Sequence, residues 1–424
     1  MAILQLKSTN PKLSYLIKKN PDSRMIIRAI RQGLAFGWFS CPDNQIYNIY
    51  FKDADNDISY KKHKEETFEY LNVSRYSTPI FPMNAISEFF SATVKNKHEF
   101  DTPGYEHQLV VPFVYIQFPK YVEFFNDHFD GYSFNIEQQA YKSFTVTITT
   151  EKGLYELLNV ASLLFLFLAL IGNEYIEMQN DLIQKFVNLI VALDAPYFIR
   201  YLFVRNMLSN RKLFFTFKEQ LEHTSRYQIE LVFGNTLVQR RNAIEKLLKF
   251  DKSIVDIGCG EGNYAFPFSE KISGDHYYAI DTDEAIINQL DEKIRKRGNE
   301  NIFTYCSIDE FIEHYNEEKV DVILTEVIEH MPMEMAEQLI RQILDHIQFE
   351  SFVITTPNED FNQFYVLDEF RHLDHHWEIG EVEFQSWIKR IVNDDHFELE
   401  FLKIGDQVNG IPVTQGVLIT ERRS

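Results

Sequence analysis

The sequence contains few cysteines, and this scarcity limits the kinds of site that it can build. Cys41, Cys259 and Cys306 are the only three among 424 residues, and they stand far apart. An odd, widely spaced set predicts neither a disulfide framework nor a zinc site of paired thiolates. Free thiols are typical of proteins in a reducing compartment. We therefore expect a cytoplasmic protein.

Positive charge is also scarce. The 42 Lys and Arg residues are outnumbered by 63 Asp and Glu residues, which leaves a formal net charge of −21. A protein that wraps duplex DNA needs a broad basic surface, so we expect no DNA partner. This charge still permits local contact with one RNA end. The basic clusters that do occur, Arg240–Arg241 among them, are interpreted as solvated helix faces.

Long apolar runs are missing as well. A helix needs about 20 apolar residues to cross a bilayer. The most apolar stretch, residues 157–172, is shorter and contains Asn159, so we interpret it as a buried core helix. Lys7, Lys12 and Lys18 interrupt any apolar segment near the start, which argues against a secretory signal. We expect no membrane partner.

The sequence does contain enough apolar material for two domains. Its apolar fraction is 45%, and 424 residues exceed one typical domain. Residues 1–222 mix aromatic-rich strands with helices, which predicts an α+β domain. Residues 223–424 alternate helix and strand, which predicts an α/β domain with a Rossmann-like, doubly wound parallel sheet. Its expected strands are residues 253–257, 277–280, 320–324 and 351–355, with a terminal antiparallel hairpin at 397–404 and 413–421.

A glycine-rich loop follows the first of these strands. The run Val-Asp-Ile-Gly-Cys-Gly-Glu-Gly contains Gly258, Gly260 and Gly262, whose backbones can approach a ligand closely. Such a loop alone is weak evidence, because dinucleotide sites share it and an ordinary strand-to-helix turn also uses glycine. Asp256 before the loop and Asp281 after the next strand favour a positively charged cofactor over a pyrophosphate.

The motif resembles that of the class I methyltransferases, which bind S-adenosylmethionine (SAM). A nicotinamide-type GxGxxG motif would place a third glycine at position 263, where this chain has Asn263. A carboxylate at Asp281 can accept hydrogen bonds from both ribose hydroxyls of the cofactor. By sheet topology, the adenine is expected near Ser307. We therefore predict a class I, SAM-dependent methyltransferase domain.

A cluster of acidic and imidazole side chains follows the strand at 320–324. Glu326, Glu329 and His330 have the spacing i, i+3, i+4, which places them on one face of a helical turn. A second cluster farther along the chain contributes His375. Two carboxylates and two imidazoles suit Mn²⁺ or Mg²⁺, and Mn²⁺ accepts imidazole more readily. The alternative interpretation is that Glu326 caps the following helix and that the histidines are surface residues.

Three segments together resemble the Hen-type small-RNA 3′-terminal ribose 2′-O-methyltransferases. They are Glu-x-x-Glu-His at 326–330, Thr-Pro-Asn-Glu-Asp-Phe-Asn at 356–362 and Arg-His-x-Asp-His-x-Trp-Glu at 371–378. The resemblance covers residues 236–421 closely and implies that Glu326, Glu329, His330 and His375 bind the metal. The chain departs from the usual family motifs at Asp360, Trp377 and Ile379, which leaves the metal ligands intact.

The resemblance implies a reaction at the 3′ end of RNA. The methyl group of SAM would pass to the 2′-hydroxyl of the terminal ribose, whose pKa a divalent ion on the 2′ and 3′ oxygens would lower. His372 or His376 is the candidate residue for removing the proton. Phe361, Phe364 and Tyr365 are candidates for stacking on the terminal base, although a core role is an equal alternative.

The first half of the chain also resembles the bacterial branch of this family, at residues 13–21 and 149–208. That resemblance implies a partner, a polynucleotide kinase-phosphatase-ligase of RNA repair, which the N-terminal half activates. Two other functions are weighed against the predicted one. The chain could serve as a ligase-activating scaffold, or it could methylate a small molecule or a protein.

Overall fold

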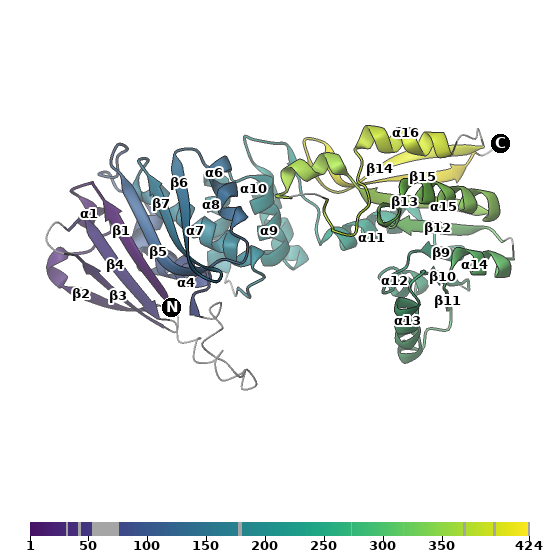
Figure 1. Ribbon diagram of the computed structural model, residues 1–424, viewed down its shortest axis with the longest axis horizontal. Coiled ribbons are helices and arrows are strands. Elements are labelled where there is room, and N and C mark those ends of the chain that lie inside the picture. Colours follow the sequence, from purple (N-terminus) through teal and green to yellow (C-terminus); the bar gives the residue numbers. More distant parts are fainter. Residues whose placement is uncertain are drawn as a thin grey trace. The chain divides into compact units, whose positions relative to one another are not determined.

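The computed structural model describes residues 1–422, except for 31–32, 41–43, 53–75, 177–179, 273, 317, 368–369 and 393–395. The chain divides into two compact units, Met1–Arg226 and Tyr227–Ser424. Each unit has its own sheet and its own helices (Figure 1). The boundary predicted from the sequence, after residue 222, falls where the last helix of the first unit ends.

The N-terminal unit is built on a seven-stranded antiparallel sheet with the order β2-β3-β4-β1-β5-β7-β6. Its strands are β1 (Ala2–Ser8), β2 (Met25–Ile30), β3 (Gly33–Phe39), β4 (Ile46–Lys52), β5 (His107–Tyr115), β6 (Tyr132–Ala140) and β7 (Ser143–Thr150). Alternate residues of β1, β4 and β7 are buried, as the two-residue period of a one-sided sheet requires.

The helices of this unit include one long apolar helix, α7 (Leu154–Ile171). The others are α1 (Leu13–Leu16), α4 (Ile80–Phe89), α5 (Ser91–Lys95), α6 (Lys120–His128), α8 (Asn180–Ala192), α9 (Tyr197–Met207) and α10 (Arg211–Glu222). By length and composition α7 could cross a membrane, but 83% of it is buried inside the protein. Its packing against α4, α5 and α9 confirms the predicted core helix. The carboxylate of Asp101 caps it by accepting bonds from the N–H groups of Leu154 and Tyr155, both at 2.8 Å.

The C-terminal unit is built on an eight-stranded mixed sheet with the order β11-β10-β9-β12-β13-β15-β14-β8. The strands are β8 (Ile229–Glu230), β9 (Ile254–Ile257), β10 (Tyr277–Ile280), β11 (Ile302–Tyr305), β12 (Val320–Thr325), β13 (Phe349–Pro357), β14 (Phe397–Val408) and β15 (Ile411–Glu421). Strands β9 to β13 are parallel, whereas β13 and β15 and then β14 pair antiparallel. This arrangement confirms the predicted Rossmann-like sheet with its terminal hairpin.

Helices cover both faces of this sheet (Figure 1). They are α11 (Thr236–Leu247), α12 (Ala265–Ser269), α13 (Glu284–Arg297), α14 (Ile308–His314), α15 (Met333–His346) and α16 (Glu381–Ile391). Val322 and Leu324 of β12 join a core with α14, α15 and α16, while Ile323 between them joins a core with α11, α12 and α13. Because β12 and β9 are parallel neighbours, their carboxyl ends lie at the same edge of the sheet. The strand order reverses between β9 and β12, and such a switch point is where these sheets bind ligands.

Candidate cofactor and metal site

The glycine loop begins directly after β9. Gly258, Gly260 and Gly262 all have positive φ, at 75°, 50° and 80°. A Cβ atom at Gly258 would lie 2.2 Å from Cγ2 of Val327, so only glycine fits there. A Cβ at Gly260 would meet nothing within 4 Å. Gly260 therefore borders open space, into which a ligand can reach the backbone.

The carboxylate of Asp281, at the end of β10, lies beside this loop. Its Oδ2 accepts a hydrogen bond from the N–H of Gly260 at 2.9 Å, and its Oδ1 accepts one from the N–H of Asp283 at 3.0 Å. Both bonds fix the carboxylate at the mouth of the loop. Ser307, predicted to lie near the adenine, caps α14 by accepting a bond from the N–H of Glu310 at 3.1 Å. Its side chain therefore has a structural role at the place where the sequence predicted a cofactor contact.

Asp256 lies underneath the loop and is fully buried. Its Oδ2 accepts a hydrogen bond from the hydroxyl of Tyr277 at 2.7 Å, whereas Oδ1 has no hydrogen-bond partner among the described residues. Burial raises the pKa of Asp256 to about 7; the bond from Tyr277 opposes this shift and the charge of Asp281 adds to it. A buried carboxylate oxygen without a donor suits a site that receives a cationic ligand. The glycine loop, Asp256 and Asp281 therefore fit SAM.

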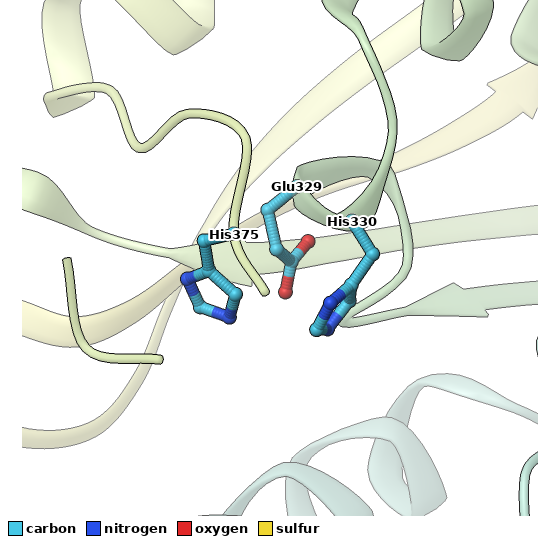
Figure 2. A group of neighbouring side chains, drawn as sticks. All are labelled: Glu329, His330 and His375. Atoms are coloured by element: carbon cyan, nitrogen blue, oxygen red, sulfur yellow. The ribbon is translucent and has the colours of Figure 1, made fainter. Parts of the chain in front are cut away.

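Three of the four predicted metal ligands come together. Candidate ligand atoms of Glu329, His330 and His375 all lie within 4.8 Å of one another. Figure 2 shows the three side chains pointing toward a shared region, with Glu329 between the two imidazoles. Glu329 and His330 belong to a 3-10 turn, η3 (Ile328–His330), just after β12. His375 reaches the same region from a loop that precedes α16.

The carboxylate of Glu329 is the least solvated group of this cluster, with a side chain fully buried in the protein. Its Oε2 accepts a hydrogen bond from the hydroxyl of Thr356 at 3.0 Å, and Oε1 has no hydrogen-bond partner in the described part of the chain. Burial, and then the nearby charge of Glu326, raise the pKa of Glu329 well above its usual value. A divalent cation would compensate both effects, so the donor set fits an ion such as Mn²⁺.

Glu326 stands apart from the other three side chains. Its Oε2 accepts a bond from Nη1 of Arg240 at 3.0 Å, and its Oε1 lies 3.3 Å from the hydroxyl of Thr355. The sequence predicted one helical face for positions 326, 329 and 330. Glu326 instead has a positive φ of 55°, and the helical turn begins only at Ile328. Arg240 was expected on a solvated helix face, but its side chain is only 13% exposed.

The loop that carries His375 is bonded directly to the turn that carries Glu329. The N–H of His376 donates to the carbonyl oxygen of Glu329 at 2.8 Å, and Nε1 of Trp377 donates to the carbonyl oxygen of Met331 at 2.8 Å. These bonds explain how His330 and His375, which are 45 positions apart in the sequence (375 − 330), share one site.

The two histidines proposed for proton removal are placed differently. The imidazole of His372 is exposed, and its centroid lies 5.2 Å from that of His375. His376 is also exposed, and the contact that ties it to the site is made by its backbone.

Of the aromatic residues proposed to stack on the terminal base, Phe361 is fully buried, which makes it a core residue. Phe364 and Tyr365 are half-buried and contact its ring, with centroids 5.2 and 5.4 Å from it.

Two acidic residues whose contacts the sequence did not reveal complete the arrangement. Oε1 of Glu378 lies 2.6 Å from Nδ1 of His375, and Oδ2 of Asp374 lies 3.1 Å from Nδ1 of His330. Burial by itself would raise the pKa of Glu378. Hydrogen bonds from Asn362, from the backbone N–H of residue 371 and from His375 outweigh that effect and hold the pKa below its usual value. The carboxylate is thus stabilised in its charged form inside the protein.

Two family models match the chain, one in each of its two units. Residues 3–226, more than half of the chain, match the family described as the Hen1 N-terminal domain. Residues 254–348 match the family described as a methyltransferase domain. None of the curated proteins matches the sequence.

Two solved structures resemble nearly the whole chain. A chain from the structure titled "Structure of the Pnkp1/Rnl/Hen1 RNA repair complex" is 25% identical, with a TM-score of 0.81, and the match covers 99% of this chain and 100% of that one. A chain from "Structure of Pnkp1/Rnl/Hen1 complex" is 24% identical, with a TM-score of 0.76 and the same coverage of both chains. At 24% identity, the second match indicates a shared fold but carries no statement about function.

Proposed function

The chain belongs to the Hen1 family, and on that premise we propose that it methylates RNA at its 3′ end. The methyl group passes from SAM to the 2′-hydroxyl of the 3′-terminal ribose, and the reaction serves RNA repair. The oxygen–methyl bond forms as the bond from methyl to sulfur breaks, and the hydroxyl loses its proton.

The observation that carries this proposal is the contact between the two halves of the site. Gly258 of the cofactor loop packs against Val327, which lies between Glu326 and Ile328 at the start of the acidic turn. The place for a methyl donor and the place for a metal therefore adjoin each other. A methyl acceptor held at Glu329 and His375 would sit beside the cofactor, and such proximity supplies much of the rate in a two-substrate reaction.

Each side chain then has a specific task in the proposed reaction. Asp281, at the mouth of the glycine loop, binds the ribose hydroxyls of the cofactor. Glu329, His330 and His375 hold a divalent ion, Mn²⁺ or Mg²⁺, which when bound lowers the pKa of a ribose hydroxyl and orients it. Glu326 remains a proposed fourth ligand, because its Oε1 is engaged only at 3.3 Å while Oε2 takes the ion pair with Arg240.

We assign removal of the proton to His372. Its exposed ring lies beside His375, so a substrate hydroxyl at the site would be near it, whereas the structure ties His376 to the site through its backbone alone. The sequence left both His372 and His376 as candidates for removing the proton, and this assignment selects His372. The side chain of His372 also has direct access to water, to which it can pass the proton.

The test of this function is an assay with radiolabelled SAM and a short RNA that ends in a 2′,3′-diol. We expect methyl incorporation that needs a divalent ion, stops with a chelator, and yields RNA whose end resists periodate. Oxidising the RNA with periodate before the reaction removes the acceptor and serves as the control. Incorporation that survives this oxidation would show that the methyl group goes elsewhere on the RNA.

The N-terminal unit has a second proposed role, as the part that binds and activates an RNA ligase. The proposal rests on the family match over residues 3–226 and on the similar structures, which are complexes of Hen1 with Pnkp1 and Rnl. We expect such a complex in the cytoplasm, as the cysteine content suggests. The intact acidic turn and glycine loop favour an active enzyme over a scaffold with a dead site.

Ligase activation and methylation should be separable in the full-length protein. We expect the His375→Ala variant to stimulate end joining by a kinase-phosphatase-ligase partner as well as the unmodified chain does, because His375 belongs to the C-terminal unit. End joining by the partner alone gives the baseline. A parallel loss of stimulation and methylation in this variant would contradict the division of labour.

A further inference from the structure

Both imidazoles of the proposed metal site have one ring nitrogen already engaged by a carboxylate. Nδ1 of His375 lies 2.6 Å from Glu378, and Nδ1 of His330 lies 3.1 Å from Asp374. Asp374 and Glu378 come from the same short loop as His375. In each ring, Nε2 is the nitrogen that remains for a ligand. Figure 2 shows one nitrogen of the His375 ring on the side of Glu329 and the other on the opposite side.

The environment of Glu378 determines where the proton of His375 resides. Oε1 also accepts a bond from the N–H of Arg371 at 2.9 Å, and Oε2 accepts one from Nδ2 of Asn362 at 2.5 Å. The side chain of Glu378 is 0% exposed, so water does not compete for these bonds. An ionised carboxylate can only accept hydrogen bonds. Since both oxygens of Glu378 accept bonds from N–H donors, the neutral imidazole of His375 carries its proton on Nδ1 and its lone pair on Nε2.

The loop itself is held firmly enough to orient the ring. The guanidinium of Arg371 donates to Oδ1 of Asn362 and to the carbonyl oxygen of Val413, both at 2.6 Å, and also to the carbonyl oxygen of Asn358. Asn362 is thereby held by Arg371 on one side while it donates to Glu378 on the other. The tautomer and the direction of the His375 ring thus follow from one half-buried network of hydrogen bonds that ends on the buried carboxylate of Glu378.

We propose that Glu378, and to a smaller extent Asp374, are positioning residues that keep Nε2 of His375 and of His330 free to bind the divalent ion. This proposal rests on the metal ion of the proposed function. It adds two residues that contact the histidine ligands and do not contact the ion themselves. Glu378 should contribute more to metal binding than Asp374. Asp374 has a side chain that is 71% exposed, so water can replace it, whereas the buried Glu378 has no substitute.

The substitution Glu378→Gln tests the role of the charge at nearly constant shape. A glutamine has one acceptor oxygen for the three donors that meet here, and its amide group is itself a donor. If that group faces the ring, the proton of His375 moves to Nε2 and blocks the ligand position. If it faces Asn362 instead, two donors oppose each other and the network loosens. Either way the ion should bind more weakly.

We expect Glu378→Gln to raise the dissociation constant for Mn²⁺ by about 10- to 100-fold, the range typical of such outer-sphere partners. Asp374→Asn should raise it no more than about threefold, as for an exposed pair. The matched control is Glu383→Gln, on an exposed position of α16, which should leave the constant unchanged. Free Mn²⁺ is measured by electron paramagnetic resonance on the full-length protein, and SAM binding serves as the check that each variant folds.

A second measurement does not depend on the metal at all. Two-bond ¹⁵N–¹H correlations of the metal-free protein report which nitrogen of each histidine carries the proton. We expect Nδ1–H at His375 in the unmodified chain, and in Glu378→Gln either Nε2–H or a mixture of the two tautomers as the network loosens. A proton on Nε2 in the unmodified chain would overturn the positioning role, as would unchanged Mn²⁺ affinity in the variant. Failure of the unmodified chain to bind Mn²⁺ would instead overturn the metal part of the proposed function.

Discussion

Replacement of Glu329 by glutamine is expected to reduce methyl transfer by about a thousandfold or more while SAM still binds. Glutamine keeps the length of the side chain and an oxygen for the bond from Thr356, so the turn should fold as before. It removes the charge that faces His330 and His375. Metal binding to a reacting oxygen supplies several kcal/mol of transition-state stabilisation, and ~4 kcal/mol corresponds to about a thousandfold in rate.

The comparison variant for this experiment is Asp281→Asn, which should show the opposite pattern. Asp281 lies at the cofactor loop, so this variant should bind SAM weakly and Mn²⁺ normally. His375→Ala should behave like Glu329→Gln. Single-turnover rates, SAM titrations and Mn²⁺ titrations on the same preparations separate the two effects. Undiminished turnover of Glu329→Gln in the presence of a chelator would refute the metal mechanism.

The variant Glu326→Gln distinguishes a direct ligand from an electrostatic neighbour. In the structure this carboxylate is paired with Arg240 and lies outside the group of three, yet its charge acts on Glu329. A ligand role predicts a loss as large as that of Glu329→Gln. A neighbour role predicts a much smaller loss, since the three remaining donors would hold the ion.

Much of this site follows from local sequence pattern. A glycine loop after an apolar strand has few conformations, so the turn at Gly258 and Gly260 could be predicted without any knowledge of distant residues. The doubly wound sheet follows in the same way from alternating strands and helices. His375 could be paired with Glu329 only through the resemblance to a family, because the bonds that bring the two loops together are tertiary contacts.

Other features had no local signature. The spacing of Glu326 to Glu329 suggests a helix, but a residue with positive φ before the turn breaks that pattern, and spacing alone does not reveal backbone conformation. The doublet Arg240–Arg241 does not show which arginine is buried, since the carboxylate that pairs with Arg240 lies 86 residues away. Likewise β1 lies between β4 and β5, and such a long-range pairing is set by the whole sheet.

The chemistry of the RNA end should matter more than its sequence. An RNA with a 2′-deoxyribose at its 3′ terminus has no acceptor oxygen, so we expect no methylation, while a 2′-deoxyribose one position upstream should have little effect. An RNA with a 3′-phosphate should also be refused. An ion that binds both terminal oxygens would lose the 3′ oxygen when that oxygen carries a phosphate, and the charges of Glu326 and Asp374 beside the three proposed ligands add to the penalty for a dianion.

RNAs that differ at the 3′ end are best compared as competitors of the standard 3′-diol substrate in one reaction. Unlabelled 3′-diol RNA should suppress labelling of the standard substrate. RNA with a terminal 3′-phosphate should compete about tenfold more weakly or worse, since an ion that binds both terminal oxygens loses one of them. A change at the 5′ end, from hydroxyl to phosphate, is the matched control for added charge and should leave competition unaltered. Equal methylation of the terminal 2′-deoxy and 3′-diol RNAs would exclude the ribose 2′-oxygen as acceptor, because the former lacks the only oxygen that the proposed reaction uses.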